Sequence, residues 1–193
     1  MMIIIGITGT IGAGKGTIVE YLVEKKDFAH YSVRAFLLEE IKRRNMTENR
    51  DSMFNLANKL RSLHGPSWVT DQLYKMAVLS GKNCIIESIR TPGEINSLRG
   101  KEKFYLLAVN ADPYIRYERI GLRQSETDKV SYETFLENES RESDSSDPNK
   151  QNLRQCISMA DFVFENNGTK EELLRRVDEV LEKIDFLTMN NKQ

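Results

Sequence analysis

The 193-residue chain has few of the residue types that build disulfide frameworks or thiolate metal sites. It contains only two cysteines, Cys84 and Cys156, and two histidines, His30 and His64. The cysteines lie far apart, and neither has a second cysteine or histidine at metal-ligand spacing. We therefore expect buried or partly buried free thiols, and histidines that serve packing or hydrogen bonding.

The chain also lacks an excess of charge of either sign and any long apolar run. Its 28 Lys and Arg residues balance 29 Asp and Glu residues, so a nucleic acid partner is not expected and any affinity for phosphate must be local. No apolar stretch approaches the roughly 18 residues that a membrane-spanning helix needs. The sequence predicts a soluble, cytoplasmic protein, and its length suits one α/β domain.

The most specific feature of the sequence is a glycine-rich loop at residues 9–17. It follows a short β-branched run, as a buried strand would, and precedes a segment with helical spacing of apolar residues. Strand, loop and helix form the context of a phosphate-binding loop, in which backbone N–H groups and a lysine surround phosphates. The alternative is a glycine-rich turn without a ligand. The predicted ATP-binding residues are Gly9, Gly12, Ala13, Gly14, Lys15, Gly16 and Thr17.

One position departs from the commonest form of this loop. Gly16 follows Lys15, so the hydroxyl that approaches Mg²⁺ is expected one place later, at Thr17. This Gly-Lys-Gly-Thr variant resembles the adenylate kinase group of P-loop kinases.

The rest of the chain alternates short apolar runs with amphipathic segments. Five such runs separated by helices predict a P-loop NTPase fold, with a five-stranded parallel sheet and helices on both faces. Strands are expected at about 2–7, 28–33, 83–87, 104–109 and 161–164. Helices are expected at about 18–26, 34–44, 50–63, 66–79, 131–142 and 170–184, and from Pro92, Pro113 and Pro148 onward.

Ligands of such sheets bind beyond the carboxyl ends of the strands, which directs attention to three side chains. Glu87 ends the third strand and can hold Mg²⁺ or its waters, or orient an acceptor; the alternative is a helix-cap or surface carboxylate. Arg90 can grip an acceptor phosphate through two hydrogen bonds. Arg34, after the second strand, can reach the same phosphate or can be a solvated helix charge.

A second group of arginines follows the fourth strand. Spacings of three, four and seven residues put Arg116, Arg119 and Arg123 on one helix face, where their repulsion favours neutralisation by anions. The polar stretch at 124–129 suits a lid that closes over the transferred group. Arg141 is a further candidate for contact with phosphate, or an exposed arginine among glutamates.

Taken together, these segments resemble P-loop kinases of the nucleoside monophosphate and dephospho-coenzyme A kinase type over nearly the whole chain. The resemblance implies that Lys15 and the loop amides hold ATP phosphates, that Glu87 is the acidic residue after the third strand, and that Arg90 is the acceptor-phosphate arginine. It matches Arg116, Arg119 and Arg123 to the lid arginines only as a group. Ala35 and Leu38 stand where adenylate kinases have an aspartate and an arginine, which disfavours adenosine monophosphate as acceptor.

The function expected from this resemblance is Mg-ATP-dependent phosphoryl transfer to a nucleoside or deoxynucleoside monophosphate. Dephospho-coenzyme A is the alternative acceptor, and an ATP-binding regulatory switch is the alternative of another class. The expected organisation is a single kinase domain over residues 1–193, with an acceptor-binding helical segment at about 34–80 and a lid at about 116–148.

Overall fold

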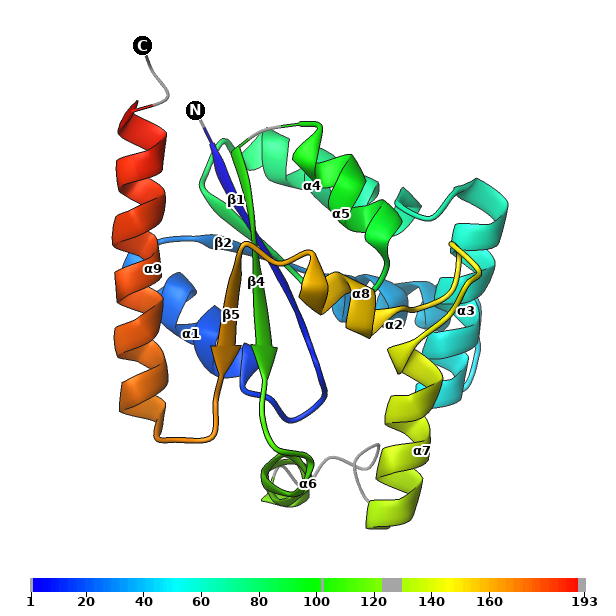
Figure 1. Ribbon diagram of the computed structural model, residues 1–193. Coiled ribbons are helices and arrows are strands. Elements are labelled where there is room, and N and C mark those ends of the chain that lie inside the picture. The colour runs from blue at the N-terminus through cyan, green and yellow to red at the C-terminus, as the bar shows by residue number, and fades with distance from the viewer. Residues whose placement is uncertain (1, 102, 123–129, 191–193) are drawn as a thin grey trace.

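A computed structural model describes residues 2–101, 103–122 and 130–190 of the chain (Figure 1). The strands are β1 (Ile3–Gly9), β2 (Ala29–Ser32), β3 (Cys84–Glu87), β4 (Lys103–Asn110) and β5 (Phe162–Glu165). The helices are α1 (Lys15–Lys26), α2 (Val33–Arg43), α3 (Arg50–His64), α4 (Trp68–Ser80), α5 (Pro92–Arg99), α6 (Pro113–Leu122), α7 (Tyr132–Ser143), α8 (Leu153–Ser158) and α9 (Lys170–Asn190).

The five strands form one parallel sheet in the order β2-β3-β1-β4-β5. The loop strand β1 lies at the centre, between β3 and β4, and is buried along its whole length. Every strand therefore ends at the same edge, with the glycine-rich loop in the middle of that edge. The predicted α/β class and five-stranded parallel sheet are confirmed.

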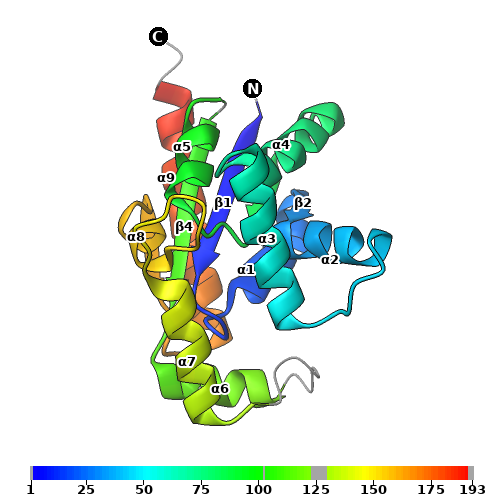
Figure 2. The ribbon, with the colours of Figure 1, turned by 90° about the vertical axis from the view of Figure 1, so that its right-hand side faces the viewer.

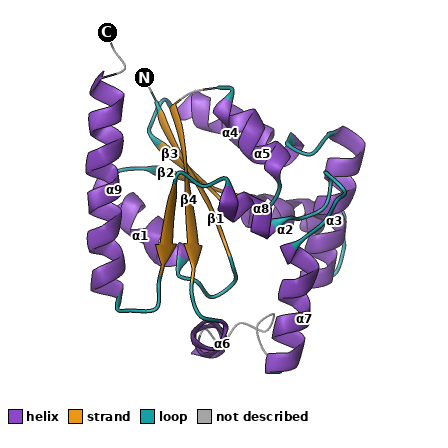
Figure 3. Ribbon diagram, in the orientation of Figure 1, coloured by secondary structure: helices purple, strands orange, loops and turns teal. Residues whose placement is uncertain are grey.

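Helices cover both faces of the sheet, and the two-residue period of the strands divides the core between them. On one face Ile5 and Ile7 of β1 pack with Ile18 and Leu22 of α1 and with α9. Figure 3 shows these two helices together on one side of the strands. Isoleucines on alternate sides of the central strand β1 thus anchor a helix layer on each face.

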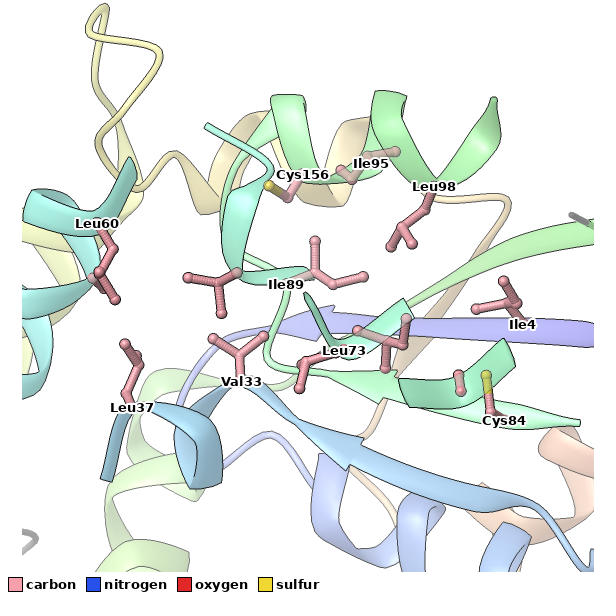
Figure 4. Close-up of a cluster of buried hydrophobic side chains, with 14 of the residues drawn as sticks. Ile4, Val33, Leu37, Leu60, Leu73, Cys84, Ile89, Ile95, Leu98 and Cys156 are labelled. Atoms are coloured by element: carbon pink, nitrogen blue, oxygen red, sulfur yellow. The ribbon is translucent and has the colours of Figure 1, made fainter. Parts of the chain in front are cut away.

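The opposite face of the sheet carries the larger helical layer of α2, α3, α4, α5 and α8. Ile4 of β1 faces this layer, and Figure 4 shows Leu37 of α2 directed toward Leu60 of α3. Both cysteines are buried in this cluster as free thiols, as the sequence predicted. Burial raises the pKa of Cys84 to about 12 and raises that of Cys156 as well.

Polar caps fix where several helices begin. Thr91 and Glu94 form a reciprocal capping box at the start of α5, with Pro92 in the first turn, as their spacing predicted. The helix expected from Pro148 begins instead at Leu153, where the Asn152 side chain accepts a hydrogen bond from the Gln155 N–H. The prediction of a helix start at Asp147-Pro148 was wrong, because this pair forms a turn that Lys150 N–H closes onto the Asp147 carbonyl.

α7 stands away from the sheet, and its last turn lies beside the first turn of α3 (Figure 2). Residues 123–129, the centre of the expected lid, lie outside the described part of the chain. Within that part, no helix has the length and apolar character needed to span a bilayer.

Candidate active site

The glycine-rich loop connects β1 directly to α1 and requires glycine where it turns. Gly12 and Gly14 have φ angles of 77° and 108°, in a region that L side chains rarely adopt. A Cβ on Gly12 would lie 2.5 Å from the Arg116 carbonyl oxygen, and one on Gly14 would lie 2.4 Å from Asn166 Nδ2. The loop therefore packs tightly against α6 and the segment after β5, and it leads directly into the start of α1, where a helix favours anions.

Side chains distant in the sequence hold the loop in place. Asn166, directly after β5, is buried and donates its amide N–H to the Ala13 carbonyl over 2.8 Å. Thr10 donates its hydroxyl to Asn110 Oδ1, at the end of β4, over 3.0 Å. Two neighbouring strand ends thus fix the loop from one side.

Lys15 lies at the mouth of the loop. Its ammonium group donates to the carbonyl oxygens of Gly9 and Thr10, over 2.9 and 2.7 Å. It lines the same cavity as Glu87, and its charge is one of the influences on that carboxyl group. A lysine so close to the loop carbonyls can turn toward phosphate oxygens when these provide better partners.

Glu87 ends β3 beside the loop and is held as a carboxylate. Burial alone would raise its pKa, but the His30 imidazole, whose Nε2 lies 3.6 Å from Oε2, and the charge of Lys15 lower the pKa to about 2. Ser32 and Ser88 donate hydroxyl hydrogen bonds to it over 3.2 and 2.9 Å. Such a residue remains ionised at neutral pH and is suited to hold Mg²⁺ or its waters.

A cation at this position would find few protein ligands. Among the described residues, no three His, Cys, Asp or Glu side chains gather at one point. Thr17 of α1 and Glu87 at the end of β3 both line the cavity. This donor set fits Mg²⁺, which takes one or two protein oxygens and completes its shell with water and phosphate oxygens.

One cavity of about 620 Å³ extends from the loop to the helical layer. Its loop end is formed by Ile11, Gly12, residues 14–17 and Glu87. The opposite end has an apolar wall from α2 and α3 and a group of arginines. The apolar residues are Val33, Leu37, Met53, Phe54 and Ala57, and the arginines are Arg34, Arg50, Arg61 and Arg90.

Arg90 lies in this cavity and is held by a carboxylate from α7. Glu142 accepts hydrogen bonds from Arg90 Nη1 and, over 2.8 Å, from Arg50 Nη2 of α3. Gln151 Oε1 accepts a second bond from Arg90 over 2.9 Å. Burial would raise the pKa of Glu142, but the Arg90 and Arg50 guanidinium groups hold it below its ordinary value. These contacts form an ion triad that joins α3, α7 and the segment after β3, and two of its members, Arg50 and Arg90, line the cavity.

Arg61 contributes a buried charge to the cavity from α3. Its side chain is 1% exposed and donates to Asn58 Oδ1 and Glu94 Oε1, both over 3.4 Å. Its Nε has no hydrogen-bond partner among the described residues.

The remaining predicted acceptor arginines occupy different positions. Arg34 is exposed at the start of α2 and lines the cavity. Arg141 is half-exposed, pairs with Asp51 over 3.2 Å and lies over the Phe54 ring. It is absent from the described cavity lining, in which Arg34 and Arg90 lie.

The helix α6 carries Arg116 and Arg119 outside that lining. Arg116 is 3% exposed, pairs with Glu139 over 2.8 Å and donates to the carbonyls of Ala111 and Ile11. Arg119 donates to the Asn166 carbonyl over 2.9 Å. Glu139 thus neutralises Arg116, while Arg119 donates to backbone carbonyls, and both arginines brace the segments that hold the loop. Arg123 lies outside the described residues.

Several residues of this site were missed by the sequence analysis: His30, Arg50, Arg61, Glu142 and Asn166. Arg61 did carry a signal, because a charged residue lies beside Leu56, Ala57 and Leu60 on the buried face of α3. Asn166 and Glu142 carried none, since each acts on a segment distant in the sequence.

Comparison with known proteins identifies relatives that match 95% of the chain. The AAA domain family matches residues 5–144. The chain is 31% identical over 186 residues to a UPF0200 protein of Methanocaldococcus jannaschii, and the match covers 95% of this chain and 91% of the relative. It is 30% identical to a UPF0200 protein of Methanococcus vannielii, with 95% and 97% covered.

Solved structures with low sequence identity share the fold. A Thermus thermophilus protein, TT1252, has a TM-score of 0.64 at 21% identity, over 94% of this chain and 97% of that one. Shikimate kinase from Bacteroides thetaiotaomicron has a TM-score of 0.55 at 15% identity, over 94% and 99%. The fold is therefore that of P-loop kinases.

Proposed function

The chain belongs to the UPF0200 family and to the AAA domain family, and from this premise we propose that it transfers a phosphoryl group from Mg-ATP to a nucleoside or deoxynucleoside monophosphate. One observation carries the proposal. A single cavity has a phosphate loop at one end and, at the other, an apolar wall beside several arginines. A kinase needs two such ends, because donor and acceptor must meet without water.

The chain's own groups would divide the work of positioning and charge stabilisation. The N–H groups of residues 9–17 and Lys15 would bind the donor phosphates, while Thr17 and Glu87 would hold Mg²⁺, which neutralises phosphate charge when bound. Arg90 would leave Glu142 for the acceptor phosphate, with Arg34 nearby. The apolar side chains of α2 and α3 form a surface on which the flat ring of a nucleobase would pack. A polyol would not use such a surface.

The lid part of the proposal rests on α6, α7 and the segment between them. Arg116 and Arg119 would have to leave their present contacts to reach the transferred group. Arg123, which lies outside the described residues, is the third candidate. Arg141, at the edge of α7, would approach the acceptor in the same closure.

The test is ADP release, measured by a coupled assay with Mg-ATP and a panel of acceptors. The panel contains ribonucleoside and deoxynucleoside monophosphates, dephospho-coenzyme A, shikimate and a hexose. Release that depends on a monophosphate and exceeds the ATP-only rate at least tenfold supports the proposal. ADP release with dephospho-coenzyme A alone would identify that compound, and not a monophosphate, as the acceptor. ATP binding with no acceptor-dependent release would favour the regulatory switch.

Lys15→Ala should reduce the acceptor-dependent rate by about 10³-fold, because a charge at the transferred phosphate is removed. The matched control is Lys25→Ala, an exposed lysine at the other end of α1, which should retain the wild-type rate. Both variants should keep the wild-type circular dichroism spectrum. An unchanged rate in Lys15→Ala would contradict the mechanism.

A further inference from the structure

Arg61 is the one described residue whose buried side-chain nitrogen lacks a partner. A buried guanidinium ordinarily uses its donors fully, because an unpaired buried charge is costly. Here the two hydrogen bonds that Arg61 makes are both 3.4 Å long, near the upper limit of such contacts. The protein therefore compensates this charge poorly.

The carboxylate beside Arg61 is already engaged elsewhere. Glu94 Oε2 accepts the backbone N–H groups of Arg90 and Thr91 over 2.7 and 2.9 Å, as part of the α5 cap. Only Oε1 faces Arg61. Through its two oxygens Glu94 links Arg61 to the backbone of Arg90, so the two arginines line the cavity as neighbours around one carboxylate.

The charges at this end of the cavity do not cancel. Four guanidinium groups line the cavity there, and two buried carboxylates pair with three of them, which leaves an excess of two positive charges within this group. Lys15, Glu20 and Glu87 line the loop end of the same cavity and together carry a charge of −1. The arginines are Arg34, Arg50, Arg61 and Arg90, and the carboxylates are Glu94 and Glu142. A phosphomonoester carries a charge of about −1.5 to −2 at neutral pH and would neutralise this excess.

We infer that Arg61 is an anion-binding residue of the acceptor pocket, and that it and Arg90 together bind a phosphomonoester group that the acceptor already carries. This inference rests on the proposed function in taking the α2 and α3 end of the cavity as the acceptor site. A neutral sugar or alcohol could accept a hydrogen bond from Arg61 Nε but would leave the excess positive charge, and a monocarboxylate would neutralise only half of it. The acceptor class is thus a phosphorylated metabolite with an apolar or aromatic body.

The test is direct binding to the full chain, measured by isothermal titration calorimetry without turnover. The probes are nucleoside monophosphates, the matching nucleosides and inorganic phosphate, with Mg-ATP titrated separately. The wild type should bind its best monophosphate at least tenfold more tightly than the matching nucleoside. Arg61→Lys keeps the charge but loses the planar donors, so it should weaken monophosphate binding about 10-fold and leave Mg-ATP binding unchanged.

A second variant guards against misfolding from an unpaired Glu94. Arg61→Met combined with Glu94→Gln removes both charges together and should weaken monophosphate binding about 100-fold, with Mg-ATP binding retained. Lys59→Met, an exposed change on the same helix, is the control and should bind as the wild type does. In a turnover assay the Arg61 variants should raise the acceptor KM with little effect on the ATP KM.

Three results would overturn the inference: no binding of any monophosphate by the wild type, equal affinity for monophosphate and nucleoside, or monophosphate affinity within twofold of wild type in both Arg61 variants. Its failure is separable from that of the proposed function. Monophosphate binding that depends on Arg61, without any ADP release, would contradict the proposed kinase activity and support the anion site. ADP release that no Arg61 variant alters would support the kinase activity and contradict the role of Arg61.

Discussion

Asn166 acts on the phosphate loop from 153 positions away in the sequence. Its amide satisfies the buried Ala13 carbonyl, and its Nδ2 lies where a side chain on Gly14 would clash. The conformation of the loop is therefore decided by an interaction between single residues, in addition to the glycines that permit it.

Asn166→Ala should leave the Ala13 carbonyl unpaired and lower the free energy of unfolding by about 1 to 3 kcal/mol. Mg-ATP affinity should fall with it, because the loop loses its support. The neighbouring Asn167 provides a matched control, because it is exposed and its side chain accepts a hydrogen bond from the Asp112 N–H. Asn167→Ala should lower the free energy of unfolding by less than about 1 kcal/mol and leave ATP affinity unchanged. Urea denaturation and calorimetry measure both, and equal effects of the two variants would contradict this role.

At the level of elements, α7 is attached to the rest of the molecule by the ion triad around Glu142. The carboxylate is 7% exposed and joins Arg50 of α3 to Arg90 after β3. Phe135 and the Arg116–Glu139 pair attach the earlier turns of the helix to α6. Arg90 is also the proposed acceptor ligand, so acceptor binding and the position of α7 share one residue.

Glu142→Gln should destabilise the protein by about 1 to 3 kcal/mol at pH 7, because two arginines lose their buried counter-charge. The pKa of Glu142 is lowered in the folded state, so its contribution is present above the ordinary glutamate pKa of about 4.3 and is lost as the pH falls through the folded value. The difference between wild type and variant should therefore shrink below about pH 4. Glu137→Gln, an exposed change on α7, should be neutral; a difference that stays constant with pH would refute the assignment.

At the scale of the whole molecule, the loop and the cavity belong to the same sheet edge that organises the core. Ligand binding at that edge should therefore stabilise the folded chain as a unit. Mg-ATP at 100 times its Kd adds about 2.7 kcal/mol to the free energy of unfolding. For a chain of this length this corresponds to a rise in Tm of about 5 to 10 °C.

Differential scanning fluorimetry measures this shift. Lys15→Ala should show less than half of the wild-type rise, because the affinity for the outer phosphates is reduced. Lys59→Ala, an exposed lysine of α3 away from the loop, should show the full rise. Equal shifts in all three proteins would exclude the loop as the ATP site.

Much of the framework was predictable because its causes are local. Ile3 to Ile7 alternate between the two faces of the sheet, the Gly9 to Thr17 loop follows directly, and Thr91 and Glu94 cap α5 within four residues. Pro148 misled the prediction for the same reason: a proline permits a helix start but does not require one, and the tertiary position of Asn152 decided the boundary.

By itself, then, the sequence determined the strand and helix periods, the phosphate loop and the edge of the sheet at which Glu87 and Arg90 lie, since these follow from neighbouring residues and from parallel connectivity. Only the tertiary structure decided which charges meet. It paired Glu142 with Arg50 and Arg90, placed Asn166 on the loop, turned Arg116 and Arg119 toward protein oxygens and left Arg61 short of a partner. The physical reason is that a charge acts through its nearest neighbours in space, and folding brings these neighbours from distant parts of the chain.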